Sequence, residues 1–455
     1  MKRSAWRYLW TAHDVRRKLL ITILILAIYR LAAHVPVPGE NPDAIKAIIE
    51  SGGAAGGFIG ILDLLSGGTV SNFSVLAMGV YPYITAQIIL QLLVPIIPSM
   101  QKRMEEDPRE GQKWMEKWTY ILAVPMAALN AIGQINIFNS LASQLPGSPV
   151  VIPNFGLFSS NWLSSWTIIL SMTAGTMFAI WLGELISEFG IRNQGLSLII
   201  FSGIVSRIPA TIYSLWADVQ TRYIAIAFTL VITVLIIFAI VFVQQGRRNI
   251  PVMYPGRRVG SRMSMPVKGT LPLMVNMAGM IPLIFAQALL SFPAIIASYF
   301  MGSQIEWVKN LATQITNLFG GNSPFYWLMY FLMVVGFSFF YTDVLFAQQN
   351  YGENLKKVGA QIPGVSRGAP TQRYLTRVLR RITFPGALFL GLVAILPFLL
   401  SQLLALFGFG FGARSSVLLI NSAGLLIVVG VVRDTFFTID AELRLHGYDD
   451  TLLVR

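Results

Sequence analysis

The sequence predicts an all-α membrane protein with ten transmembrane helices. Of its 455 residues 55% are hydrophobic and only 12% are charged, and the mean hydropathy is +0.63. A spanning helix needs roughly 20 predominantly apolar residues. Lipid admits only helices or closed barrels, and the apolar runs lack the alternation of barrel strands. Ten such runs occur, at about 19–36, 74–95, 119–138, 163–183, 196–214, 223–243, 271–298, 325–346, 384–404 and 415–432.

The distribution of basic residues predicts the orientation of these helices. Twenty-eight of the 34 Lys and Arg fall in the two termini and in the loops after the second, fourth, sixth and eighth segments. The positive-inside rule then places both termini in the cytoplasm and requires an even number of helices. The basic N-terminus followed by an apolar run is also compatible with a signal peptide. A retained first helix is favoured, because the basic region is long and Val35-Pro36-Val37-Pro38-Gly39 follows the run.

A twelve-residue pattern occurs twice in the chain, 200 residues apart. Residues 79–90 and 279–290 share six of twelve positions. Paired hydrophobic segments interrupted by Gly and Pro in two halves of a chain indicate a pathway at the interface of two repeats. Coincidence is the alternative, because Gly and Pro are common in membrane helices. The shared residues are Gly79, Pro82, Ile84, Ala86, Gln87 and Leu90, with Gly279, Pro282, Ile284, Ala286, Gln287 and Leu290.

Several chemistries are disfavoured by what the sequence lacks. There is no cysteine, the three histidines are scattered, and neither a phosphate-binding GxxxxGK[ST] loop nor an HExxH zinc motif is present. No cofactor or metal is therefore expected. The central parts of the second to tenth apolar segments hold no ionisable residue, which disfavours ion-coupled transport and membrane-embedded catalysis. Isolated polar residues do occur there. They either form hydrogen bonds that hold helices together, or make weak contacts along a seam at which two helices can separate: Thr85, Gln87, Gln91, Asn276 and Gln287.

A short apolar segment at 58–65 does not fit the ten helices. Glycines flank it on both sides, and eight apolar residues are too few to cross a bilayer. It is either a re-entrant element, tolerated where it lines a cavity, or a helix at the membrane interface.

Two large basic loops are predicted on the cytoplasmic side, at 244–270 and 347–382. Their charge is explained equally by topology and anionic lipid, or by docking of an anionic partner such as ribosomal RNA or an acidic motor surface. Their length, with embedded Gly and Pro, is typical of functional loops. The residues in question are Arg247, Arg248, Arg257, Arg258, Arg262, Lys356 and Lys357.

Several motifs spread along the chain are typical of one family of membrane proteins: Arg30 with residues 35–39, 66–92, Trp181-Leu182-Gly183-Glu184-Leu185-Ile186-Ser187-Glu188, 271–282, Asn354-Leu355-Lys356-Lys357 with Ile362-Pro363-Gly364, and 425–430. By these motifs the chain resembles, over essentially its whole length, the SecY family of protein-conducting channel subunits.

The resemblance implies a specific architecture. Helices 1–5 and 6–10 form two inverted, pseudo-symmetric halves (1–215 and 216–455) around an hourglass pore. An aliphatic ring would close the waist, with a plug at about 56–68 outside it. A lateral gate of helices 2 and 3 facing helices 7 and 8 would carry the polar seam. The implied ring residues are Val80, Ile84, Leu196, Ile200, Ile281 and Ile427. The implied plug residues are Phe58, Ile59, Ile61, Leu62, Leu64 and Leu65, and the gate residues are Thr85, Gln91 and Asn276.

Two departures from the family pattern affect the assignment of residues. Residues 190–195 are one residue longer than the family's Gly-Ile-Gly-Asn-Gly, which leaves the register of Leu196 and Ile200 open. The family's partner-contacting arginine aligns with Ser366, and the resemblance implies that Arg367, the next residue, contacts the partner instead.

The implied function is a passive channel, not an enzyme. It would pass unfolded secretory polypeptides with signal sequences and release transmembrane segments sideways into lipid. The implied partners are SecE- and SecG-type membrane subunits and a SecA-type motor ATPase or a ribosome. The implied location is the inner (plasma) membrane of a bacterium, with a plastid membrane as the other possibility. The competing hypothesis is a secondary transporter of small solutes with inverted repeats.

Overall fold

A computed structural model gives the arrangement of fourteen stretches of the chain. It describes residues 13–45, 73–94, 97–143, 150–153, 155–156, 162–206, 208–217, 222–255, 258–259, 262–263, 267–300, 305–319, 323–406 and 422–445.

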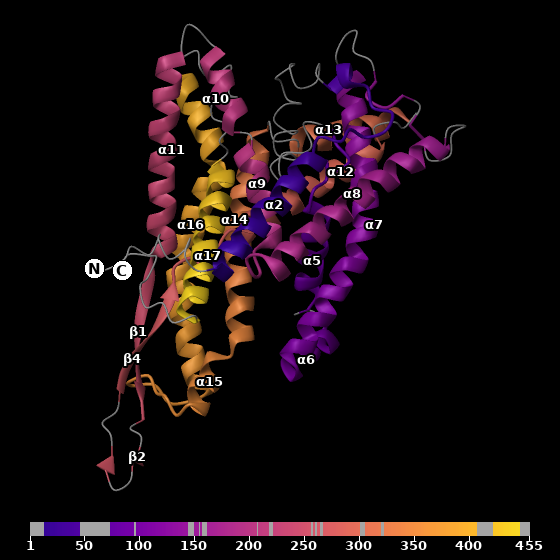
Figure 1. The fold of residues 1–455 in the computed structure, drawn as a ribbon. Helices are drawn as coiled ribbons and strands as arrows, with labels where there is room; N and C mark the ends of the chain where they lie inside the picture. The colour runs from indigo at the N-terminus through magenta and orange to yellow at the C-terminus, as the bar shows by residue number, and fades with distance from the viewer. Residues whose placement is uncertain are drawn as a thin grey trace.

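The described chain is a bundle of helices with one β-hairpin projecting from it (Figure 1). The helices are α2 (His13–Ala32), α5 (Tyr81–Leu93), α6 (Pro98–Glu106), α7 (Pro108–Ser143), α8 (Trp162–Phe189), α9 (Gly195–Ser206), α10 (Ile208–Ala217), α11 (Arg222–Gln245), α12 (Ile281–Phe300), α13 (Glu306–Phe319), α14 (Pro324–Gln349), α15 (Tyr351–Lys357), α16 (Ala369–Leu406) and α17 (Ser422–Leu445). The strands are β1 (Arg247–Tyr254), β2 (Arg258–Val259), β3 (Arg262–Met263) and β4 (Val267–Met274).

Each of the ten predicted apolar segments coincides with a described helix over all or part of its length. In chain order they are α2, α5, α7, α8, α9 with α10, α11, α12, α14, α16 and α17. By length and composition, five of the described helices are long and apolar enough to cross a membrane. A sixth span results if α5 and α6, bent by 96°, count as one. The last predicted segment, 415–432, is described only from Ser422 onward.

The sequence repeat has a structural counterpart in how α5 and α12 begin. Gly79 (φ +51°) and Gly279 (φ +63°) both adopt the left-handed backbone conformation, which glycine tolerates best. In each copy the helix begins two residues later. Pro82 and Pro282 occupy its second position, where an N–H needs no partner within the helix. The two copies therefore build the same turn into a helix, which favours a repeat over coincidence as the explanation of the pattern.

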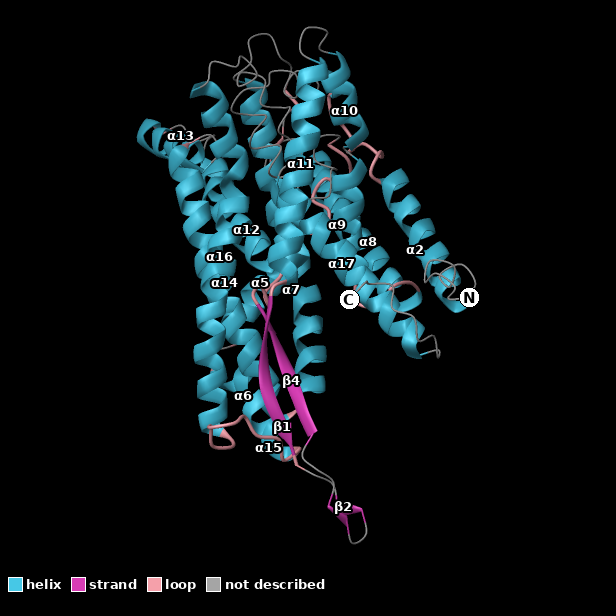
Figure 2. Ribbon diagram, turned by 90° about the vertical axis from the view of Figure 1, so that its left-hand side faces the viewer, coloured by secondary structure: helices cyan, strands magenta, loops and turns pink. Residues whose placement is uncertain are grey.

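The β-hairpin alters the predicted start of one helix. β1 and β4 pair antiparallel from Arg247 with Met274 to Tyr254 with Val267, and the hairpin extends toward β2 at its far end (Figure 2). The predicted helix at 271–298 therefore begins too early, and α12 starts only at Ile281. Leu271 and Leu273 extend the apolar run in the sequence. They lie two residues apart, on one face of a β-strand, but the average hydropathy of such a strand does not distinguish it from the start of a helix.

The second predicted loop is also shorter than its 347–382 range. α15 takes up its first part and α16 begins at Ala369, so residues 358–368 form the connection. Leu375, Leu379 and Ile382 are buried at helical spacing, while the arginines between them kept this stretch below the hydropathy of a span. The basic residues from Arg373 onward thus lie on a helix.

Candidate functional site

All six residues of the predicted ring belong to one hydrophobic cluster. Val80, Ile200 and Ile427 are buried members of it, with 0%, 5% and 3% of their surfaces exposed. Ile84, Leu196 and Ile281 pack against it half-buried. We call these six residues the waist cluster.

The waist cluster draws on both halves of the chain. Two of its residues come from α5 and the turn before it and two from α9, while α12 and α17 contribute one each. Its side chains are all aliphatic, so the cluster offers no fixed hydrogen-bonding or charged group. In channels generally, a constriction lined by apolar side chains closes by excluding water.

The position of α9, which carries Leu196 and Ile200, is fixed by a close crossing with α8. A Cβ on Gly195 would lie 1.7 Å from the carbonyl oxygen of Gly183. The Ser187 hydroxyl joins the two backbones: it donates to Gly183 O (3.1 Å) and accepts from the Gly195 N–H (3.1 Å). Such contact between backbones is possible only without a side chain.

The three predicted gate residues differ in their surroundings. Thr85 is buried, and its hydroxyl donates to Tyr81 O in the same helix (3.0 Å). Asn276 is buried as well, but it lies in the segment before α12 and donates to Gly279 O (3.0 Å). Gln91 Oε1 is buried without a hydrogen-bond partner in the described part of the chain. Of the three residues, Gln91 is therefore the one with a buried polar atom that has no partner among the described residues.

Contacts between the two halves occur at both the repeat and the first helix. The Tyr81 hydroxyl donates to Ala288 O (3.4 Å), which joins α5 to α12. On another side of the bundle Lys18 Nζ lies 2.6 Å from Glu442 Oε1, joining α2 to α17. Arg192 Nε lies 4.0 Å from the same oxygen. A single carboxylate thus serves two cations of the first half.

The predicted plug lies outside the described residues. Its six side chains fall within 46–72, so their assignment remains a prediction.

The hairpin and the 358–368 segment form one unit, which we call the basic platform. Met253 N donates to Gln361 O (2.8 Å) and Gln361 N donates to Met253 O (2.9 Å). A small core lies beneath, formed by Ile250, Val252, Leu273, Phe346, Ala360, Ile362, Leu375, Leu379 and Ile382. Because this core includes side chains from α14 and α16, the platform is attached to the bundle by packing as well as by the chain.

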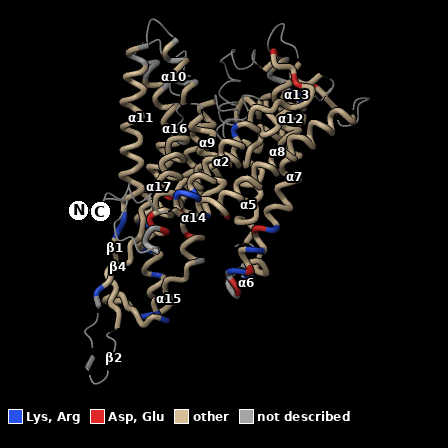
Figure 3. The backbone as a smooth tube through the Cα atoms, viewed as in Figure 1, with Lys and Arg blue, Asp and Glu red and all other residues tan. Residues whose placement is uncertain are grey.

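The predicted docking residues lie on or beside this platform. Arg247, Arg248, Lys356, Lys357 and Arg367 are exposed. In Figure 3 the blue of Lys and Arg gathers on β1, α15 and α6, and few charges are drawn along the helices above them. Of the remaining docking residues, Arg258 lies in β2 and Arg262 in β3, while Arg257 is outside the described residues.

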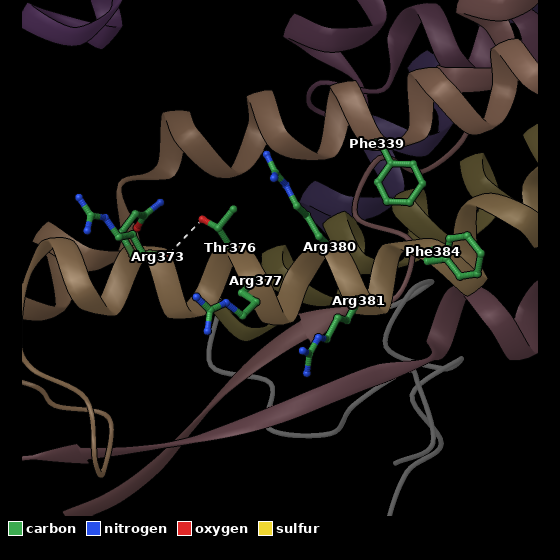
Figure 4. A pocket seen from close by; sticks show the side chains of 8 residues that line it. Phe339, Arg373, Thr376, Arg377, Arg380, Arg381 and Phe384 are labelled. Carbon is green, nitrogen blue, oxygen red and sulfur yellow. Dashed lines mark hydrogen bonds between the residues drawn. The ribbon is translucent and has the colours of Figure 1, made fainter.

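The arginines of α16 fall within the basic loop predicted at 347–382, and no role apart from that loop's was predicted for them. Arg373, Arg377, Arg380 and Arg381 line an open hollow of about 740 Å³ beside α14 (Figure 4). Their spacing of three and four residues was the available signal, because it places side chains on one helical face. No group of three or more His, Cys, Asp or Glu suited to a metal ion occurs among the residues the structure describes.

Comparison with known proteins identifies the fold and the family. A family model described as SecY matches residues 74–436. The chain belongs to the SecY family. A protein translocase subunit SecY of Streptomyces scabiei is 35% identical over 448 residues, covering 96% of this chain and 97% of the relative. One from Aquifex aeolicus is 37% identical over 450 residues, with 97% of each chain covered.

Solved structures show the same fold at lower identity. The structure of a protein conducting channel has a TM-score of 0.61 and 17% identity, covering 96% of this chain and 95% of the other. A SecY protein whose plug domain stabilises the closed state has a TM-score of 0.61 and 18% identity, with the same coverage. The protein is thus a multi-pass membrane protein with the helical SecY fold.

Proposed function

We propose that this chain is the channel-forming subunit of a protein translocase, in which an unfolded polypeptide passes through the waist cluster. The observation that carries the proposal is that the six aliphatic residues of the predicted ring, from both halves of the chain, all lie in one large hydrophobic cluster. A translocating polypeptide varies in size and charge, and fixed polar groups would retain some sequences. A flexible aliphatic ring interacts weakly with all of them and closes around the chain by excluding water. The relatives are translocase subunits, which supports this role and the prediction that the chain is not an enzyme.

Lateral release is the second part of the proposal. The gate lies where α5 and α7 face α12 and α14, with Thr85, Gln91 and Asn276 near its seam. Burial of an apolar segment there is favourable by roughly 25 cal/mol per Å². The weak Tyr81 to Ala288 contact (3.4 Å) is the kind of link that such a segment would replace. In the resting channel, the segment at about 56–68 would plug the pore outside the ring.

The energy for translocation comes from outside this chain in our proposal. The basic platform faces the cytoplasm, as do both termini, and docks an anionic partner, either a SecA-type motor ATPase or a translating ribosome. SecE- and SecG-type subunits complete a translocon in the plasma membrane. The two halves, 1–215 and 216–455, move against each other around the waist.

Disulfide trapping tests the path of the polypeptide directly, because the chain has no cysteine. Single cysteines are placed at Ile84, at Ile281 and at Leu235, a residue of α11 that is 61% exposed. A secretory chain with one cysteine is then stalled in translocation. Disulfides at Ile84 and Ile281, with none at Leu235, would place the polypeptide in the waist. Translocation without a crosslink at either waist position would refute the pathway and return solute transport to first place.

A further inference from the structure

α13 carries an exposed apolar face that belongs neither to the waist cluster nor to the basic platform. Trp307, Leu311 and Leu318 are large apolar residues with 69%, 50% and 39% of their surfaces exposed. Their spacings of four and seven residues place them on one side of the helix. We call these three residues the α13 stripe. In Figure 1 and Figure 2 α13 lies toward the end of the bundle opposite the hairpin.

The other two sides of α13 face the bundle and water. Ala312 is buried, and Phe319 packs half-buried against two hydrophobic clusters of the bundle. At 3.6 residues per turn the α13 stripe falls between this packed side and a polar side. The residues of the polar side are exposed, and they are Glu306, Lys309, Asn310, Gln314 and Asn317.

The length of α13 decides how it can meet a membrane. Its 14 residues rise about 21 Å, whereas the hydrocarbon core of a bilayer is about 30 Å thick. α13 is therefore too short to cross. An amphipathic helix of this kind lies in the membrane surface instead, with its apolar face about 5–10 Å into the boundary between headgroups and acyl chains. Tryptophan, here Trp307, is enriched at that depth.

The α13 stripe continues into the surface that the neighbouring helices expose. Phe325 and Leu328 of α14 are exposed, and α14 is long and apolar enough to cross a membrane. The ring of Phe319 in α13 meets that of Phe325 edge-on, with centroids 6.0 Å apart. In α12, against which α13 packs, Ile296 and Phe300 are exposed. Because the exposed surface of a membrane-crossing helix faces lipid, the same lipid reaches the stripe.

The charge of α13 narrows the choice of partner further. Glu306 and Lys309 are the charged residues of this helix, and their charges cancel. The helix therefore offers neither a basic patch for anionic lipid or nucleic acid nor an acidic one for a basic protein. Burial of apolar surface remains as the driving force, and it does not depend on the headgroup.

We propose that α13 is an interfacial helix whose stripe is embedded in the lipid bilayer. The stripe reaches the acyl boundary of the leaflet away from the basic platform, and the polar side faces water. Ala312 and Phe319 attach the helix to the bundle at that level. The occupant of the stripe is bilayer lipid of any headgroup. The inference uses the multi-pass fold alone, so it stands whether or not a polypeptide passes through the waist cluster.

Spin-label scanning tests the proposal on the full chain, which has no native cysteine. Single cysteines are placed at the three stripe positions and at Asn310 and Gln314 on the polar side, labelled, and reconstituted into phosphatidylcholine liposomes. Collisions are measured with oxygen, which concentrates in hydrocarbon, and with a nickel chelate, which stays in water. Stripe labels should favour oxygen, at a depth of about 5–10 Å, and polar-side labels should favour nickel. Leu235 of α11 and Lys268 of the hairpin, both exposed, give the lipid and water references.

A matched pair of variants tests whether the stripe holds the helix at this depth. Leu311→Asp places a charge on the stripe, and a label at Leu318 should then change from favouring oxygen to favouring nickel. Gln314→Asp places the same residue on the polar side and should leave the depth at Leu318 unchanged. Both positions are exposed, so neither variant disturbs the packed side of α13. A label at Leu235 with parent collision rates confirms that the bundle is intact.

Three results would overturn the proposal. Nickel collision rates at the stripe equal to those at Lys268 would place the stripe in water. Stripe labels that neither reagent reaches would mean that protein covers the stripe. It would be a second copy of the chain if label mobility rises on dilution with lipid, and another segment of the same chain if mobility does not change. An unchanged depth at Leu318 in Leu311→Asp would show that lipid burial of the stripe does not hold α13 in place.

Discussion

Substitution of Gly195 by alanine tests whether the α8–α9 crossing holds the waist cluster in place. The added carbon would lie 1.7 Å from Gly183 O, half the 3.4 Å at which ordinary contact begins. Neither backbone can yield alone, because Ser187 ties them together through two hydrogen bonds of 3.1 Å. α9 must therefore shift, and Leu196 and Ile200 shift with it. Overpacking of this kind lowers the free energy of unfolding on the order of 3 kcal/mol.

Gly336→Ala provides the control, because a Cβ on this α14 glycine would meet no atom within 4 Å. Alanine there should leave the free energy of unfolding unchanged or raise it by up to about 1 kcal/mol. Both variants are unfolded by denaturant in detergent, and ion leak is measured after reconstitution into liposomes. We expect Gly195→Ala alone to be destabilised and to leak ions. A Gly195→Ala protein as stable and as tight as the parent would refute both the close crossing and its role in sealing the waist.

Three further predictions concern other contacts. Glu442→Gln should weaken the attachment of α2 to α17 by about 1 kcal/mol, since Lys18 and Glu442 are partly exposed and screened; a double-mutant cycle with Lys18→Gln showing no coupling at low salt would contradict it. Burial raises the pKa of Glu40 from 4.5 to about 7. This carboxyl therefore ionises at lower pH in the unfolded chain than in the folded chain, so the free energy of unfolding should fall as pH rises from about 4.5 to about 7. Glu40→Gln should flatten this profile, and an unchanged slope would assign the pH dependence to another group. Gln361→Pro removes the N–H that donates to Met253 O and should speed proteolysis of the hairpin, with unchanged cleavage showing that the two segments are held together by packing alone.

Much of the fold could be predicted because membrane-spanning helices can be recognised by their apolar composition. Helices such as α8 and α11 are continuous apolar runs whose limits hydropathy locates closely. The start of α12 could not be found in this way. Leu271 and Leu273 of β4 extend the apolar run, and the left-handed turn at Gly279 that separates strand from helix depends on backbone conformation rather than hydropathy. The structure shows that α12 begins two residues after Gly279, just as α5 begins two residues after Gly79.

The waist cluster could not be predicted from residue types alone, because isoleucine and leucine occur on every face of every helix. The resemblance to a known family selected six of them, and all six lie within one large hydrophobic cluster of the structure; their role as a ring stays a prediction. The arginine hollow was missed for a different reason. Hydropathy placed Arg373 and Arg377 in a predicted loop. Two residues four positions apart share a face only if they lie on a helix, so the loop assignment hid their common orientation.

The platform's attachment to α16 has a mechanical consequence. Its core includes Leu375 and Leu379 of α16, and this helix continues without interruption to Leu406, a rise of about 56 Å. Prolines at 385 and 397 lie within it, and a proline inside a helix removes one backbone hydrogen bond and favours bending there. A force on the hairpin is therefore transmitted to the part of α16 before Pro385, which moves with the platform. If the helix bends at Pro385, tilting of the platform displaces the membrane-embedded part of α16 sideways.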